Sequence, residues 1–337
     1  MPGYSAARRR GIPYNDQRFK ETSSLAFKNQ ANSASTLQAC LGGAQRKRSG
    51  WCRPLMSKLP PPSAPTGPAD RILQQALLAL QMERLDEAER LAAQVLKSSR
   101  GNIPAARLLG RVLLAQNRPI EAIDVLQRSV RRCEDAELET LLAIALGAAK
   151  RDDDAIAQLQ RTLTRRPPFP PAFIELSRQL SEKGRFEEAI KLLETALAAS
   201  PDHVDLRMAL GYLHLKRNDR PGAKAAFQRV RELAPDRYET LGAMAKVLVL
   251  DGEYAGAADL YRNALALRPD DVLTRINLGK CLLELGERDA GESTLRAAIR
   301  TAPQFAGRAI LALAAAPHGR VFLRPSAAAA FLRADKN

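Results

Sequence analysis

Side chains that could hold a metal ion or act as nucleophiles are few and widely spaced in this sequence. The four cysteines stand at positions 40, 52, 133 and 281 without CxxC spacing, and the three histidines are His203, His214 and His318. A structural zinc site needs about four such ligands at short spacings. We therefore predict no metal and no cofactor, cysteines that stay reduced, and a neutral, hydrogen-bonded structural role for His214.

An acidic run, Asp152-Asp153-Asp154, has the composition of a metal-binding loop. It lacks the glycine and the glutamate of a calcium loop, and it directly precedes Ala155 at the predicted start of a helix. Carboxylates there interact favourably with the helix dipole and cap free N–H groups, so we predict a helix cap. The sequence also has no GxSxG, P-loop or GxGxxG context. We predict that the protein is not an enzyme.

The composition favours a helical protein. The 337 residues include only 9 Phe, 6 Tyr and 1 Trp, so the core must consist of Leu, Ala, Ile and Val, which favours stacked helices over a sheet. No stretch supplies the ~18 consecutive apolar residues of a membrane span; the longest small-apolar run is Ala309 to Ala316. No apolar signal-peptide region follows Met1. We expect a cytoplasmic protein without a membrane partner.

Residues 1–68 form a separate zone. They contain eleven basic and two acidic side chains, a net charge of +9 within a total of +15, and they end in a run rich in Pro and Ser. Such a composition buries too little apolar surface to offset the entropy lost on ordering. We predict a disordered, basic N-terminal tail that ends in a stiff proline-rich linker.

Three hypotheses for this tail remain open. It could bind nucleic acid through contacts to phosphates. It could be an organellar transit peptide, since it is rich in Arg and Ser and poor in acids. Alternatively, translation could begin at Met56, in which case residues 1–55 do not belong to the natural protein.

Small residues recur at a fixed interval after position 68. Successive members of each set are 34 residues apart, except for one interval of 33, and the second set follows the first by twelve residues. Prolines at 167, 201, 235, 269 and 303 keep the same interval. Such a period is typical of a repeat array. The first set is Ala76, Gly110, Ala143, Ser177, Gly211, Ala245 and Gly279, and the second is Ala88, Ala122, Ala155, Ala189, Ala223, Ala257 and Gly291.

Each repeat is predicted to consist of two antiparallel helices. In the fifth repeat, residues 204–216 form the first helix and Pro221 suits the first turn of the second. The second helix ends before Pro235, because the residue before a proline is pushed out of the helical region. Gly211 and Ala223 are small, so the two helices can approach closely at these positions.

The repeat resembles the tetratricopeptide repeat (TPR) family. The best matches are residues 184–189 (GRFEEA) and 252–257 (GEYAGA), the Leu-Gly pairs at 109–110, 210–211 and 278–279, and the aromatic residues Phe227 and Tyr261. The first two repeats depart from the pattern, with Arg100 and Glu134 where later repeats have proline. The resemblance implies an all-α fold, a right-handed α-solenoid of about seven helix-turn-helix TPR units.

An array of this kind also needs an end cap, because each repeat buries its apolar face only against its neighbours. We predict a C-terminal capping helix at 304–316, within a C-terminal cap and short tail at 304–337 that includes a small helix from Pro325 or Ser326. The TPR array spans 69–303, with units near 69–102, 103–135, 136–169, 170–203, 204–237, 238–271 and 272–303.

The resemblance implies that the first helices line a concave groove for partner proteins or peptides. The ninth position of each unit faces that groove, and four of its seven occupants are basic. A chance arrangement of charges on a solvated face is the alternative. Leu73 and Leu77 replace residues of the family's two-carboxylate clamp, which disfavours that class of partner. The predicted groove residues are Arg107, Arg111, Arg178, Tyr212, Lys246, Asn277 and Lys280.

We therefore predict a cytoplasmic, non-catalytic scaffold that binds a protein or peptide partner, acidic in character, in the groove. A nucleic-acid-associated protein that uses the basic tail is one alternative, although the sequence has no base-reading motif. An accessory or regulatory subunit of a separately encoded enzyme is the other.

Overall fold

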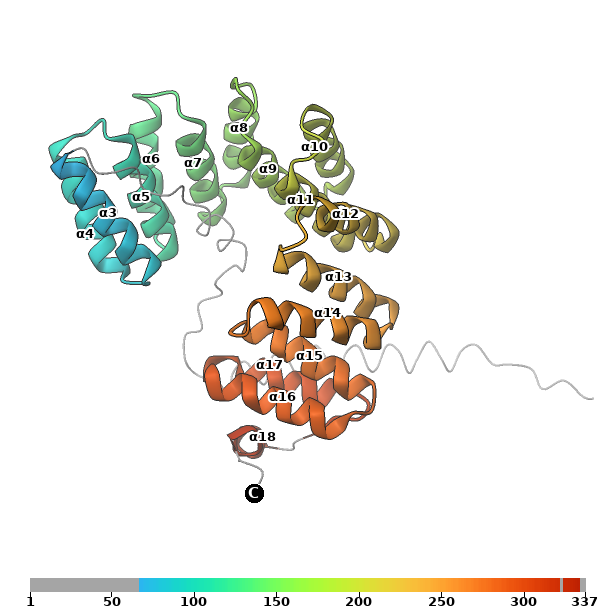
Figure 1. Ribbon diagram of the computed structural model, residues 1–337. Helices are drawn as coiled ribbons and strands as arrows, with labels where there is room; N and C mark the ends of the chain where they lie inside the picture. Colours follow the sequence, from blue (N-terminus) through green and yellow to red (C-terminus); the bar gives the residue numbers. More distant parts are fainter. Residues whose placement is uncertain (1–66, 322–323, 334–337) are drawn as a thin grey trace, which may run out of the picture. The chain divides into compact units, whose positions relative to one another are not determined.

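The computed structural model describes residues 67–321 and 324–333, and all regular structure in these ranges is helical (Figure 1). The prediction of an all-α array of seven helix pairs is confirmed. The hypotheses for the tail lie outside the described residues, apart from Pro68, which opens the first helix of the array.

Each unit consists of a first and a second helix. The first helices are α3 (Pro68–Gln81), α5 (Ile103–Ala115), α7 (Ala136–Ala148), α9 (Pro170–Glu182), α11 (Val204–Lys216), α13 (Tyr238–Asp251) and α15 (Val272–Glu284). The second helices are α4 (Leu85–Ser98), α6 (Pro119–Val130), α8 (Asp152–Thr162), α10 (Phe186–Ala199), α12 (Arg220–Leu233), α14 (Tyr254–Leu267) and α16 (Arg288–Thr301).

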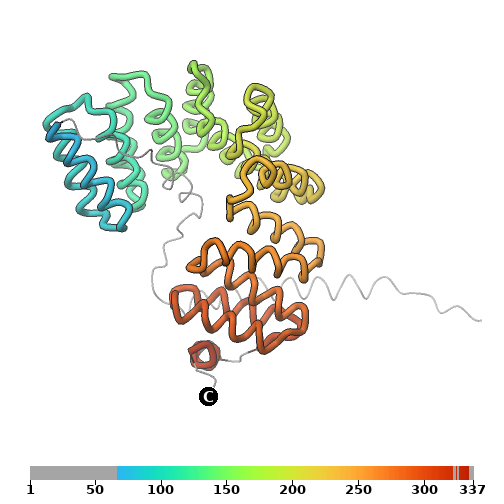
Figure 2. Tube along the Cα trace, viewed as in Figure 1, coloured from blue at the N-terminus to red at the C-terminus, as the bar shows by residue number. Residues whose placement is uncertain are grey.

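The helices pack in chain order (Figure 2). Each second helix contacts the first helix of its own unit and the first helix of the next unit. First helices also contact one another directly, in the pairs α3–α5, α5–α7, α7–α9, α9–α11 and α11–α13. We call the exposed surface of the seven first helices the first-helix face. The residues predicted to bind a partner are on these helices, and two of them, Asn277 and Lys280, are on α15.

The small residues stand where the two helices of a unit meet. A Cβ atom added at Gly211 would lie 2.5 Å from the ring of Phe227, whose side chain is fully buried. Gly110 and Leu126 show the same contact at 2.7 Å, and Gly279 and Leu295 at 2.8 Å. The 34-residue spacing of small residues therefore marks the points of closest helix approach.

Each turn between the two helices of a unit contains one residue with positive φ, between 59° and 83°. These residues keep the period of the small residues, including its single interval of 33. Glycine adopts this left-handed conformation without steric cost, whereas a residue with a Cβ atom is strained there. The seven residues are Glu83, Asn117, Lys150, Gly184, Asn218, Gly252 and Gly286.

The acidic run lies at the start of a helix, as predicted, but its predicted role as a helix cap was wrong. Asp152 begins α8, so the three carboxylates lie in its first turn, as the dipole favours. They do not cap it: the N-cap is Arg151, without a side-chain cap hydrogen bond. Instead, Arg151 donates to Asp154 at 2.8 Å, and Lys183 of the next unit pairs with Asp153. The acids satisfy neighbouring cations rather than the helix N–H groups.

A short 3₁₀ turn (Pro303–Phe305), α17 (Ala306–Ala315) and α18 (Pro325–Arg333) follow the seventh unit. The capping helix packs against α15 and α16, and α18 packs against α16 and α17. Ala309, Leu313 and Leu332 are buried in the resulting apolar cluster. The C-terminal segment thus covers the apolar surface that the last unit would otherwise expose.

Charge also holds this segment in place. Glu292 of α16 is only 1% exposed, and its carboxylate accepts hydrogen bonds from Arg288 at 3.2 Å and from Arg320 at 2.5 Å. Arg296 lies 3.6 Å from the same carboxylate and donates to the backbone oxygen of Phe331 at 3.2 Å. The guanidinium groups of Arg296 and Arg320 also stack on the Phe331 ring. We call this group the Glu292 cluster.

The helix contact in the fifth unit can be tested at Gly211. Gly211→Ala should lower the free energy of unfolding by about 1–3 kcal/mol, because its Cβ overlaps the buried Phe227 ring. Gly242→Ala is the matched control, since no atom lies within 4 Å of its added Cβ in α13. It should stabilise the protein by up to about 1 kcal/mol through helix propensity. Urea unfolding measures both; equal effects would contradict the contact.

The Glu292 cluster predicts that α18 depends on one carboxylate. Glu292→Gln should remove the charge that three arginines share and speed backbone hydrogen exchange in residues 325–333, because α18 then detaches more often. Glu287→Gln, on an exposed residue of the same unit, is the control. Unchanged exchange in the Glu292 variant would mean that apolar packing alone holds α18.

Candidate functional site

The seven residues predicted to bind a partner all lie on first helices. Arg107 and Arg111 are on α5, Arg178 is on α9, Tyr212 is on α11 and Lys246 is on α13. Asn277 and Lys280 are on α15. The structure divides them into residues with acidic partners, one partly buried aromatic residue, and residues without an ion pair.

Two of the predicted arginines pair with acids at the start of α7, the first helix of the following unit. Arg107 donates to Asp135, the N-cap of α7, and lies 2.8 Å from Glu137. Arg111 also pairs with Glu137. Its side chain is 12% exposed, and burial lowers its pKa despite the opposing effect of Glu137. These groups tie unit 2 to unit 3, so they are occupied within the chain.

Arg178 is occupied by acids of its own helix. It donates to Glu175, which is 5% exposed, and to Glu182 at 2.6 Å. Burial alone would lower the pKa of Arg178, but the two carboxylates outweigh burial and raise it. A ligand carboxylate at this point would meet an arginine whose charge is already balanced.

Tyr212 belongs partly to the core. Its ring meets the Phe227 ring edge-on, with the centroids 5.3 Å apart and an interplanar angle of 69°. Burial raises the pKa of its hydroxyl. Tyr212 therefore continues the packing around Gly211 toward the first-helix face.

The remaining three residues are open to a ligand. Lys246 and Asn277 are exposed and Lys280 is half-buried. Neither lysine forms an ion pair within the described ranges, in contrast to Arg111 and Arg178. The unneutralised part of the predicted row therefore lies in units 6 and 7.

The acids that neutralise the arginines were not recognised from the sequence as their partners. Glu137, Asp205 and Glu239 occupy the second position of their units, in the first turn of a helix, where acids also interact favourably with the helix dipole. In the structure, Glu137 pairs with arginines of the preceding unit, and Arg237 lies 2.7 Å from Asp205 and 3.7 Å from Glu239. Arginines and acids that stand about one repeat apart in the sequence were the pattern that could have predicted these ion pairs.

The histidines do not come together. His203 is the N-cap of α11 and accepts a hydrogen bond from the Leu206 N–H at 3.3 Å. His214, near the end of the same helix, has its Nδ1 2.8 Å from a carboxylate oxygen of Asp219. His318 follows α17 in the C-terminal segment. Within the part of the chain that the structure describes, no group of three or more His, Cys, Asp or Glu residues could hold a metal ion.

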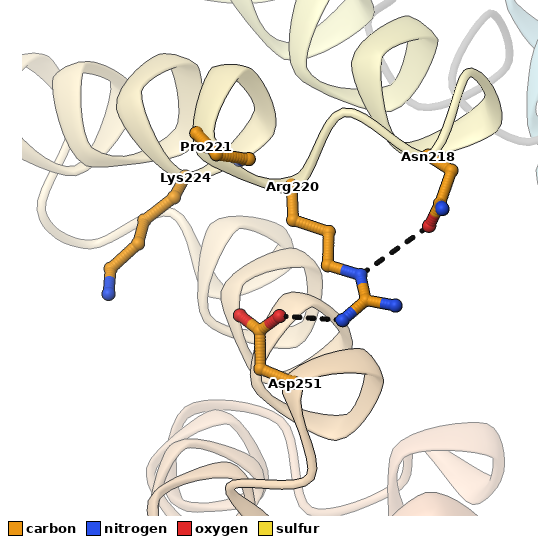
Figure 3. Close-up of a pocket in the computed structure, with 5 residues that line it drawn as sticks. All are labelled: Asn218, Arg220, Pro221, Lys224 and Asp251. Atoms are coloured by element: carbon orange, nitrogen blue, oxygen red, sulfur yellow. Dashed lines mark hydrogen bonds and ion pairs between the residues drawn. The ribbon is translucent and has the colours of Figure 1, made fainter.

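A hollow of about 480 Å³ lies beside the turn between α11 and α12 (Figure 3). Its lining is mostly polar or charged, and Arg220 reaches Asp251 at 3.0 Å and Asn218 at 3.4 Å. Lys224 points away from this pair in the view of Figure 3. The Asp251 carboxylate in this hollow is thus paired with Arg220.

None of the helices in the described ranges has the length and apolar character that crossing a bilayer requires.

Comparisons with known proteins agree with the repeat architecture. Profiles of the family described as Tetratricopeptide repeat match residues 73–137, 180–246 and 248–316. The solved structure of a tetratricopeptide repeat protein from Parabacteroides merdae superposes with a TM-score of 0.54 at 13% identity, covering 72% of this chain and 98% of the other. This likeness concerns the fold.

Two curated relatives are much longer than this chain. "Cellulose synthase 2 operon protein C" of Komagataeibacter xylinus is 31% identical over 161 residues, which cover 47% of this chain and 12% of the relative. "Cellulose synthase operon protein C" of Pseudomonas fluorescens is 27% identical over 256 residues, which cover 69% of this chain and 20% of the relative. The chain thus spans a fifth or less of either relative.

Repeats of this type generally form non-enzymatic scaffolds for protein–protein interaction. The profile matches cover more than half of the chain, and the helix pairs continue the same period between them. The chain belongs to the tetratricopeptide repeat family.

Proposed function

We propose that the array is a non-catalytic scaffold that binds an acidic protein or peptide segment on the first-helix face of units 6 and 7. The observation that carries this proposal is the contrast along the predicted row. Arg107, Arg111 and Arg178 have internal acidic partners, whereas Lys246 and Lys280 have no ion pair in the described ranges. A ligand carboxylate gains most where no internal acid must be displaced.

The side chains suit a peptide with spaced carboxylates. A lysine ammonium is a mobile point charge that tolerates several carboxylate positions. The exposed amide of Asn277 can both donate to and accept from a peptide backbone. Lysines on a shared face also strengthen each other's field, which favours an acidic partner.

An accessory role beside a separately encoded enzyme is a second candidate. It is favoured by two relatives whose names refer to cellulose synthase operons. The matched part is a small share of either relative, so this role enters as a proposal about the process served. A cytoplasmic location and nucleic-acid binding by the N-terminal tail stay predictions from the sequence.

Reversing the two free lysines tests the location of the site. Lys246→Glu with Lys280→Glu should abolish capture of partners from a lysate and weaken binding of a fluorescent Glu-rich peptide at least tenfold, measured by anisotropy. The free energy of unfolding should change by no more than about 0.5 kcal/mol at Lys246, which is exposed.

The matched control reverses Arg229 and Arg262, which lie on second helices and already have acidic partners. This double variant changes the net charge equally and should retain peptide binding. Equal losses from both pairs would show that only net charge matters, and the proposed site would be wrong.

The internal neutralisation of Arg111 gives a second test. Glu137→Gln should lower the free energy of unfolding by about 3 kcal/mol, because it leaves a largely buried guanidinium without its acid. It should also increase affinity for the same acidic peptide, since Arg111 becomes available while Arg107 keeps Asp135 as its partner. Asp259→Asn removes an exposed partner of Arg262 and should change stability by less than about 1 kcal/mol. Unchanged peptide affinity in the Glu137 variant would contradict internal competition.

A further inference from the structure

A second charged surface lies where the second helices of the first three units end. Arg100 follows α4, Arg131 and Arg132 follow α6, and Arg166 follows α8. All four are exposed. Arg128, in the last turn of α6, lies beside Arg131 around a shallow hollow on the same helix. We call Arg100, Arg128, Arg131, Arg132 and Arg166 the arginine edge.

Contacts between units join these helix ends. Arg132 donates to the backbone oxygen of Arg100 at 3.1 Å, which links units 1 and 2. Arg165, the neighbour of Arg166, reaches back to Glu134 at 2.6 Å and to Glu139 at 2.7 Å, which links units 2 and 3. The helix ends are therefore held together by the protein itself.

Three of the nearby acids are engaged elsewhere, whereas the exposed Asp124 lines the same hollow as Arg128 and Arg131. Glu134 and Glu139 pair with Arg165, and Asp135 pairs with Arg107. No member of the arginine edge forms an ion pair within the described ranges. Arg128, Arg132 and Arg166 donate to backbone oxygens, for example Arg128 to that of Asp124 at 2.8 Å. The five arginines of the edge thus exceed the one unpaired acid beside them, Asp124, in the part of the chain that the structure describes.

Helix dipoles do not require this concentration of charge. A cation near a helix C-terminus is favourable, yet α10 ends in Ala199 and α12 in Leu233 without an arginine in the two following positions. Arg268 after α14 is exposed as well, but it donates to the Tyr238 hydroxyl and stacks on that ring. Units 1 to 3 carry such arginines in successive units, and unit 2 carries a consecutive pair.

The side chains of the arginine edge indicate which class of ligand it would bind. The arginine fork matches phosphate oxygens bidentately. Between Pro68 and Pro168 the sequence has no Phe, Tyr or Trp, so these units offer no ring on which a base could stack. We propose that the arginine edge binds the phosphate backbone of a nucleic-acid duplex without reading its bases.

An acidic peptide fits this edge less well than a duplex. The edge is at the loops between units, away from the mid-helix positions of the first-helix face. A duplex presents a dense, rigid array of phosphates, about one charge per 1.7 Å of axis, to several exposed guanidinium groups at once. The +9 charge of residues 1–68 has the same sign and adds to the attraction in the full chain.

The test uses the full-length chain and a fluorescein-labelled, mixed-sequence DNA duplex of about 20 base pairs, with anisotropy measured from about 50 to about 200 mM NaCl. The test variant changes Arg100, Arg131, Arg132 and Arg166 to Gln. The slope of log K against log salt should fall by about 3 to 4, and affinity at the lowest salt should fall at least about tenfold.

The matched control changes Arg71, Arg90, Arg231 and Arg308 to Gln. These residues are also exposed and have no ion pair in the described ranges. Their substitution removes the same net charge as the test variant. The control should lose little affinity, and circular dichroism should show that both variants keep their helices. Because the N-terminal tail is intact in both, a difference between them reports the edge alone.

Three results would overturn the proposal. Equal losses in the two variants would mean that only net charge attracts the duplex. If the full-length protein did not bind the duplex at the lowest salt, the proposed site would be excluded. Polyglutamate or anionic vesicles that displace the duplex at equal charge concentration would assign the edge to an acidic protein or a membrane surface. Failure of the lysine variants on the first-helix face would not affect this proposal.

Discussion

Close approach between the two helices of each unit is the contact on which the array depends. It requires a residue with little or no side chain on one helix and a large residue on the other, as at Gly211 and Phe227. The contact recurs every 33 or 34 residues, so each unit packs its second helix against the first helix of the next. The ion pairs between units, the first-helix face and the helix ends of units 1 to 3 all follow from that regular stacking.

The spacing of small residues and prolines predicted the helix pairs because both are local constraints on backbone geometry. A proline ends a helix whatever surrounds it, and Gly211 permits a close contact whatever the partner. The acidic partners of Arg107 and Arg111 could not be predicted in this way, since they depend on how one unit overlies the next. Glu292 was missed for a related reason: its burial depends on a C-terminal segment that does not follow the repeat.

Basic side chains on the first helices have two roles. Those paired with acids stabilise the array, and those without acidic partners in the described ranges are proposed to bind a ligand. In units 2 and 4, basic side chains of the first helices pair with acids of the chain and stabilise the structure. In units 6 and 7, equivalent positions carry lysines without such partners. Composition alone, a net charge of +15, does not distinguish these two uses of the same residue types.

The uneven distribution of aromatic residues gives the array a built-in optical signal. Its tyrosines are Tyr212 in unit 5 and Tyr238, Tyr254 and Tyr261 in unit 6, while units 1 to 3 have no aromatic residue before Phe169. Tyr212 and Tyr261 are packed among core side chains, so their near-ultraviolet circular dichroism depends on ordered tertiary structure. The far-ultraviolet signal sums over every helix. Melting curves recorded in the near- and far-ultraviolet would therefore distinguish loss of tertiary packing in units 5 and 6 from unwinding of all the helices.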